Sequence, residues 1–155
     1  MSKLTSIIEV ELGQTKMHEQ VSACVLGAWR SLVVVPTEPG SSALRLAEAL
    51  VERCNLIHAN RAKLFSAEHL THGAIANLIS DVSGVVQSGG RAVIAIDAIS
   101  ARRSGAPLML IADAALLCVQ LGRTTTKNAL KTLKFAGRDR FIGAVTIDAD
   151  ADGAS

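Results

Sequence analysis

Apolar positions along the chain gather into short continuous runs, separated by longer segments in which apolar residues recur every three or four positions. A continuous run rich in Val and Ile, such as residues 32–35 or 92–96, is typical of a strand covered on both faces. A spacing of three and four is typical of a helix with one buried face. The predicted strands are residues 7–12, 32–35, 55–59, 92–97, 115–121 and 141–147. The predicted helices are residues 15–29, 43–53, 67–87, 107–114 and 124–134.

The alternation of buried strands with helices predicts an α/β fold. We expect a three-layer α/β/α sandwich around a mainly parallel sheet. One domain over residues 1–147 suits the length, and the acidic residues 148–155 are expected to form a disordered tail. Parallel sheets bind ligands at the carboxyl ends of their strands. The loops to search therefore follow Val35, Ile57, Ile96 and Leu121.

Composition narrows the class of function. The 155 residues carry a formal net charge of only +2, which does not suit a polyanion-binding protein. The chain has no Tyr, and its aromatic content of 3% argues against a stacking platform for nucleic acid. Three separated cysteines in apolar stretches are typical of buried, reduced thiols. No apolar run is long enough for a membrane span, and the N-terminus does not have the pattern of an export signal. We expect a cytoplasmic protein that does not bind nucleic acid.

The loop after the first buried strand is the first candidate site. Residues 37–42, Thr-Glu-Pro-Gly-Ser-Ser, stand where a parallel sheet often holds a phosphate. A phosphate-binding loop needs glycines, a Lys and a Ser or Thr. This loop has one Gly, two Ser and no Lys, and it carries the carboxylate of Glu38. Two alternatives remain open: an ordinary turn in which Ser41 or Ser42 caps the next helix, or a weak anion site.

Several segments nevertheless resemble one family in order and spacing. Residues 33–40 and the Ser-Ser-Ala-Leu-Arg-Leu-Ala-Glu-Ala-Leu stretch that follows resemble the phosphate-loop strand and helix of the bacterial tyrosine kinases, with the loop's Gly-Lys pair missing. Residues 56–61 resemble the second motif, with His58 and Asn60 in place of its two aspartates. Asp97 follows the third motif strand, and residues 107–125, which end in Gly-Arg-Thr-Thr, resemble the segment after it.

These kinases are the ATPase modules of capsule and exopolysaccharide export, in the MinD/ParA-like P-loop group. The resemblance implies a P-loop NTPase-like fold with a degenerate nucleotide site. A neutral His and Asn do not hold Mg²⁺ as two carboxylates do, so we expect no metal, no cofactor and no catalytic residue. The residues of the degenerate site are Pro39, Gly40, Ser41, Ser42, His58, Asn60 and Asp97.

The function implied is that of an inactive pseudo-kinase or pseudo-ATPase. It would act as an accessory or regulatory partner in the synthesis and export of an exopolysaccharide, capsule or holdfast-like polymer. Its partner would be a membrane polysaccharide co-polymerase or another glycan-assembly protein, and self-association and a peripheral contact with the inner membrane are further expectations. The alternatives are a residual nucleotide-binding ATPase of the MinD/ParA kind, which uses Asp97 and backbone amides, and an unrelated small α/β enzyme.

Charged residues outside these motifs offer weaker candidates. His69 and His72, beside Glu68, are expected to share one helix face as solvated side chains. The basic helix at residues 124–134 places three lysines on one face, which suits an anionic lipid or an acidic partner as well as plain solvent. The candidate contacts for an anion or a partner are Arg102, Arg103, Arg123, Lys127 and Lys131.

Overall fold

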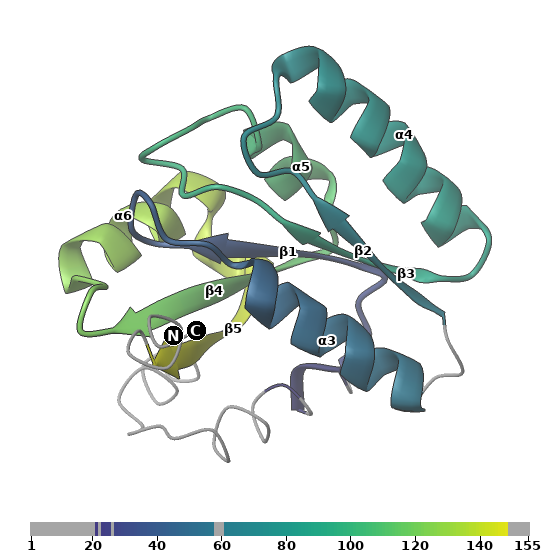
Figure 1. Cartoon of the computed structure of the whole chain (residues 1–155), viewed down its shortest axis with the longest axis horizontal. Coiled ribbons are helices and arrows are strands. Elements are labelled where there is room, and N and C mark those ends of the chain that lie inside the picture. Colours follow the sequence, from purple (N-terminus) through teal and green to yellow (C-terminus); the bar gives the residue numbers. More distant parts are fainter. Residues whose placement is uncertain (1–20, 22, 26, 58–60, 149–155) are drawn as a thin grey trace.

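The computed structural model describes residues 21, 23–25, 27–57 and 61–148 (Figure 1). Its strands are β1 (Ser31–Pro36), β2 (Ala62–Ser66), β3 (Arg91–Ala95), β4 (Ala114–Leu121) and β5 (Phe141–Asp148). Its helices are α3 (Leu44–Ile57), α4 (His72–Gln87), α5 (Ala106–Ile111) and α6 (Thr126–Ala136), with a 3₁₀ turn at Arg138–Arg140. All neighbouring strands pair in parallel, in the order β2-β3-β1-β4-β5. This confirms the predicted α/β fold.

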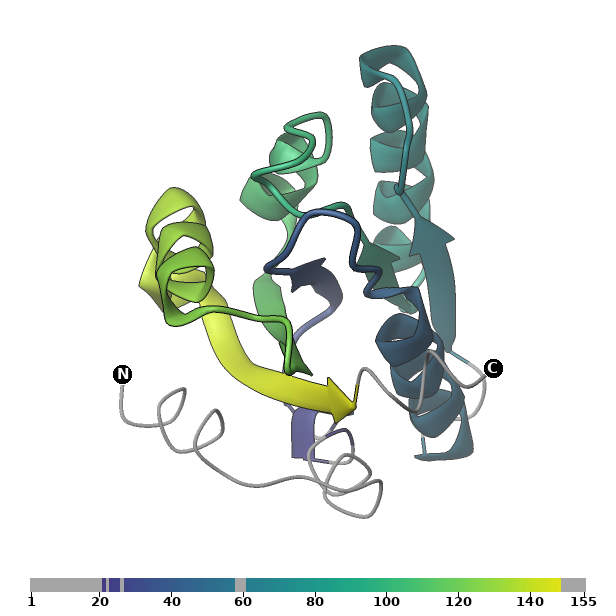
Figure 2. The same cartoon turned by 60° about the vertical axis from the view of Figure 1, so that its left-hand side comes forward.

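The helices cover the two faces of the sheet unequally (Figures 1 and 2). From β1 the chain crosses through α3 to the edge strand β2, and from there each crossover leads back in the opposite direction as far as β5. Crossovers of one hand that run in opposite directions lie on opposite faces. Accordingly, α3 covers one face and α4, α5 and α6 cover the other.

Two hydrophobic clusters form because successive strand residues point to opposite faces. Val33 and Val35 of β1 pack with α4, α5 and α6, while Leu32 and Val34 pack with α3. The helical residues 21 and 23–25 and the buried Trp29 add to the α3 side. In β5 a register shift opposite Ala115 and Leu116 moves the alternation by one residue, as a β-bulge does. The three central strands are therefore buried on both faces, as their continuous apolar runs predict.

The predicted strand at residues 55–59 is wrong. Helix α3 continues through Ile57, and the strand of this region is β2, which starts at Ala62. Leu56 and Ile57 resembled a buried strand, but they are 73% and 46% exposed at the end of the helix. The predicted helix at residues 67–87 is shorter, since α4 begins only after Thr71, whose hydroxyl caps it by accepting a hydrogen bond from the Ala74 amide.

Some predictions lie outside the described residues. These are the strand at residues 7–12, most of the helix at residues 15–29, and the acidic tail beyond Asp148. Among the helices that the structure describes, none has the length and apolar character that crossing a bilayer requires.

Candidate functional site

The carboxyl end of β1 is the point where the direction of the crossovers reverses. β1 lies between β3 and β4, and the loop after β1 leads to one face while the loops after β3 and β4 lead to the other. Such a switch point is where open α/β sheets bind ligands. The candidate site therefore consists of the loops at residues 37–43, 96–105 and 122–125, together with the loop at residues 67–71.

The loop after β1 is a tight turn. The Ser41 amide donates to the Glu38 carbonyl at 3.1 Å, with Pro39 second in the turn and Gly40 third at φ +84°. Pro followed by a residue of positive φ is the pattern of a type II turn. Ser42 Oγ accepts a hydrogen bond from the Leu44 amide at 3.1 Å. Ser42 therefore caps α3, as the first of the two predicted alternatives, an ordinary turn with a serine cap, requires. The amides of Ser41 and Leu44 are therefore already hydrogen-bonded within the loop.

The Glu38 carboxylate binds the first turn of α6. Asn128 Nδ2 donates to both of its oxygens at 2.8 Å, and the Thr125 amide lies 3.4 Å from one of them. In a capping box, a Glu in the third helical position accepts from the amide of the N-cap residue. Here that position holds Asn128, and Glu38 supplies the carboxylate from another loop. Glu38 thereby places a negative charge where the helix dipole favours one.

A second set of hydrogen bonds joins the loop after β1 to the end of β4. Thr37 Oγ1 and Thr124 Oγ1 lie 2.8 Å apart, and Thr124 Oγ1 accepts from the Gln120 amide at 2.8 Å. Ser41 Oγ donates to Gln120 Oε1, also at 2.8 Å. Thr37 and Gln120 are buried, and buried polar groups of this kind are stabilised when each has a partner. The loop is therefore fastened on the side facing β4.

On the other side, the site includes the loop after β2. Ser42 Oγ donates to Glu68 Oε2 at 2.7 Å. The Asp97 carboxylate accepts from the His69 amide at 2.7 Å, and its second oxygen lies 3.9 Å from His69 Nδ1. His69 has φ +62°, which costs energy for a residue with a side chain. Asp97 thus holds the loop after β2 in a strained conformation.

The bounds of the helices and strands correct two predictions. His58 and Asn60 lie outside the described residues, in the connection between α3 and β2, so they do not follow a strand. The residues that do follow β2 are Ala67, Glu68 and His69. His69 lies in this loop, whereas His72 is the first residue of α4, so the two histidines do not share a helix face. Among the described residues, no three His, Cys, Asp or Glu side chains are grouped as a metal site.

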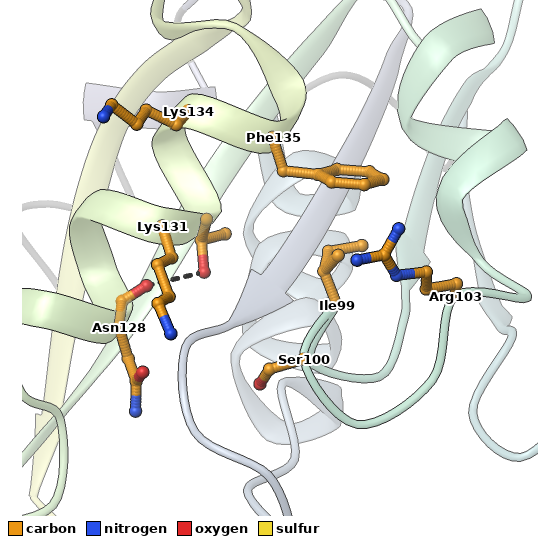
Figure 3. A pocket seen from close by; sticks show the side chains of 8 residues that line it. Ile99, Ser100, Arg103, Asn128, Lys131, Lys134 and Phe135 are labelled. Atoms are coloured by element: carbon orange, nitrogen blue, oxygen red, sulfur yellow. Dashed lines mark hydrogen bonds between the residues drawn. The ribbon is translucent and has the colours of Figure 1, made fainter.

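A pocket of about 560 Å³ opens between α6 and the loop after β3 (Figure 3). Arg103 comes from that loop, and its Cζ lies 5.3 Å from the centre of the Phe135 ring. Figure 3 shows Lys131 on α6 facing the pocket across from Ser100. The lining residues are Ile99, Ser100, Arg103, Asn128, Lys131, Thr132, Lys134 and Phe135.

A smaller pocket of about 320 Å³ lies on the other side of Arg103, against the start of α4. Arg102 and the buried Ser104 line it, and Ser104 Oγ has no hydrogen-bond partner among the described residues. The structure thus brings together Arg103 and Lys131 of the predicted contacts and puts Arg102 next to them. Arg123 and Lys127 are exposed and line neither pocket.

Comparison with known proteins gives no match: no family model, no curated protein and no solved structure matches this chain.

Proposed function

We propose that this chain is a catalytically inactive pseudo-kinase or pseudo-ATPase that serves as an accessory or regulatory protein in polysaccharide synthesis and export. The observation that supports inactivity best is the position of Glu38. Its carboxylate occupies the first turn of α6 at the switch point of the sheet and is fixed there by Asn128. A polyphosphate at this loop would meet a negative charge, and residues 37–43 contain no Lys to offset it.

The carboxylates that remain near the switch point support the same proposal. Glu68 accepts from Ser42, and Asp97 accepts from His69. Each carboxylate is thus engaged with a neighbouring loop through one of its oxygens, and only its remaining acceptor capacity would be left for the Mg²⁺ of a nucleotide. The polar groups at the loop after β1 thus serve to fix loops to one another.

Titration calorimetry with ATP and Mg²⁺ tests inactivity. We expect no heat of binding and no release of phosphate from the wild-type chain. Magnesium-dependent binding in the micromolar range, weakened by Ser42→Ala, would establish the alternative, a residual nucleotide-binding ATPase. The matched control is Ser80→Ala, which changes an exposed hydroxyl on α4 that lines neither pocket. ATP binding that persists in Ser42→Ala but weakens in Lys131→Gln would belong to the pocket of Figure 3.

The proposed role in polysaccharide export rests on the resemblance of the sequence segments, and its partner would be a membrane co-polymerase or another glycan-assembly protein. Cross-linking of the tagged full-length chain in its native host, followed by mass spectrometry, tests this role. We expect an envelope or glycan-assembly protein to be captured in a ratio near one to one. Recovery of the chain with none of these proteins would contradict the proposed role while leaving the inactive site unaffected.

A further inference from the structure

The pocket between α6 and the loop after β3 has three cationic groups in its lining and no carboxylate. They are the side chains of Arg103, Lys131 and Lys134, of which Figure 3 shows Arg103 and Lys131 at the pocket and the Lys134 ammonium turned away from it. Within the described part of the chain, none of the three lies within ion-pair or hydrogen-bond distance of an acidic side chain. Cations gathered around a concave surface raise the local concentration of anions. The lining therefore favours a ligand that carries more than one negative charge.

Arg103 is partly oriented before any ligand binds. Its guanidinium group lies against the Phe135 ring, with 5.3 Å between Cζ and the ring centre, which is within the range of a cation–π contact. Its planar group can donate two parallel hydrogen bonds to one phosphate or carboxylate. A side chain that is already oriented loses less conformational entropy on binding. Arg103 is therefore the residue best prepared to hold the anionic group.

The remaining lining suits the carbon part of an organic ligand. Phe135 is 43% exposed at the pocket, and Ile99 lies beside it (Figure 3). A volume of about 560 Å³ is in the range of small-molecule sites. The combination of an apolar wall with separate cations distinguishes this pocket from a uniformly charged surface.

We propose that this pocket binds a small phosphate monoester, with the phosphate between Arg103 and Lys131 and the carbon part against Phe135 and Ile99. The pocket lies on the α6 side of the sheet, and none of the residues of the turn at Glu38 to Ser41 lines it. The inference therefore stands whether or not the loop after β1 binds a nucleotide. Asn128 lines the pocket and also holds Glu38, so a bound ligand has a direct contact through which to affect that loop.

Calorimetric titration of the full-length chain with phenyl phosphate, in low salt and without Mg²⁺, tests the proposal. We expect measurable binding, and weaker binding of inorganic phosphate by about tenfold, because inorganic phosphate lacks the carbon part. Glucose 6-phosphate is the third probe, and it distinguishes a hydroxyl-bearing ligand from an aromatic one. No binding of any probe at millimolar concentration would overturn the proposal.

Matched variants locate the site. Arg103→Gln and Lys131→Gln should each weaken phenyl phosphate by about tenfold or more, the range for a hydrogen bond to a charged group. Arg123→Gln and Lys127→Gln remove equal charges that do not line the pocket, and they should change the affinity by less than about twofold. Equal weakening in all four variants would mean nonspecific attraction and would contradict the proposal. Phe135→Ala should weaken phenyl phosphate more than inorganic phosphate, because it removes the apolar wall as well as the ring that orients Arg103.

Discussion

At the scale of single residues, Arg91 shows how one side chain fastens the chain's early residues to the sheet. Its guanidinium group donates to the carbonyls of Val25, at 2.7 Å, and of Gly27. Its Cζ lies 4.2 Å from the centre of the Trp29 ring, and Trp29 Nε1 donates to the Cys24 carbonyl at 2.9 Å. Arg91 is the first residue of β3, so it fixes the segment before β1 to the amino ends of the strands.

Arg91→Lys should therefore destabilise the protein by about 2 kcal/mol, because an ammonium group cannot donate in a fork and stack on the indole at once. Urea unfolding followed by the fluorescence of Trp29, the single Trp of the chain, measures this change. The matched control is Arg30→Lys, since the Arg30 side chain is exposed and has no partner among the described residues. Equal unfolding midpoints for the two variants would contradict the role given to Arg91.

The same neighbourhood contains a thiol that titrates far from its usual range. Burial raises the pKa of Cys24 from 9.0 to about 12, with a further rise from Cys54 and an opposing effect of Arg91. A raised thiol pKa means that the folded state retains the proton more strongly than the unfolded state. Its contribution to stability is present below about pH 9 and is lost as the pH rises from there through the folded pKa.

Between about pH 8 and about pH 11, the wild-type chain should lose on the order of 2 kcal/mol more stability than Cys24→Ala. Urea unfolding at the two pH values measures the difference, and comparison with the variant removes the effect of lysine titration. Val25→Ala is the control, because it shortens a buried neighbour that carries no titratable group, so its loss of stability between the two pH values should match that of the wild type. Parallel losses in wild type and Cys24→Ala would show that the Cys24 thiol does not titrate as expected.

At the scale of elements, the loop after β1 and helix α6 depend on each other through Glu38 and Asn128. The two residues are 90 positions apart in the chain, and both are only partly exposed. The carboxylate also lies near the Thr125 amide, at the N-terminus of the helix. Removing either partner should therefore loosen both elements.

A double-mutant cycle with Glu38→Gln and Asn128→Ala should give a coupling energy of about 1 kcal/mol, at the lower end for a charged hydrogen bond that solvent partly reaches. Chemical denaturation of the four proteins supplies the values. Glu48 is exposed on α3, so a parallel cycle with Glu48→Gln and Asn128→Ala should give a coupling near zero. Additive effects of Glu38→Gln and Asn128→Ala would contradict the contact.

The strands that the sequence identified correctly are those whose two faces are covered. β1, β3 and β4 are continuous apolar runs because each packs against both hydrophobic clusters. The edge strand β2 reads Ala-Lys-Leu-Phe-Ser and only Phe65 is buried in it, so its pattern is too weak to distinguish from a loop. The apolar pair Leu56 and Ile57 led to a wrong strand prediction, because these residues are the exposed last turn of α3 and not part of a buried strand.

The candidate site was predictable in position but not in its contacts. The sequence placed the loop after β1 at the carboxyl edge and showed that it contains no Lys. The partnership of Glu38 with Asn128, and of Ser42 with Glu68, follows from the order of the strands, which no local pattern encodes. Phe135 comes directly after the predicted basic helix at residues 124–134, and its exposure and its contact with Arg103 are seen only in the structure.

At the scale of the whole molecule, the sheet joins two hydrophobic clusters that share no helix. Helix α3 and Trp29 belong to one cluster, and helices α4, α5 and α6 belong to the other. Successive residues of β1, such as Val33 and Val34, enter opposite clusters and are fully buried. A change of packing on one face therefore acts on the same strands that hold the other face in place.

The two faces should consequently unfold as one unit. Leu108→Ala, on the α5 side, and Leu50→Ala, on the α3 side, each remove a side chain with 0% exposure, and each should cost about 2–5 kcal/mol. Far-UV circular dichroism and Trp29 fluorescence should report the same midpoint in each variant, as a two-state transition requires. Leu130→Ala, at a site that is 40% exposed on α6, should shift either midpoint little. If Leu108→Ala lowered the midpoint seen by circular dichroism but left that of Trp29 in place, the sheet would not couple its faces. The packing on the two faces would then be lost in separate steps, although both clusters contain residues of β1.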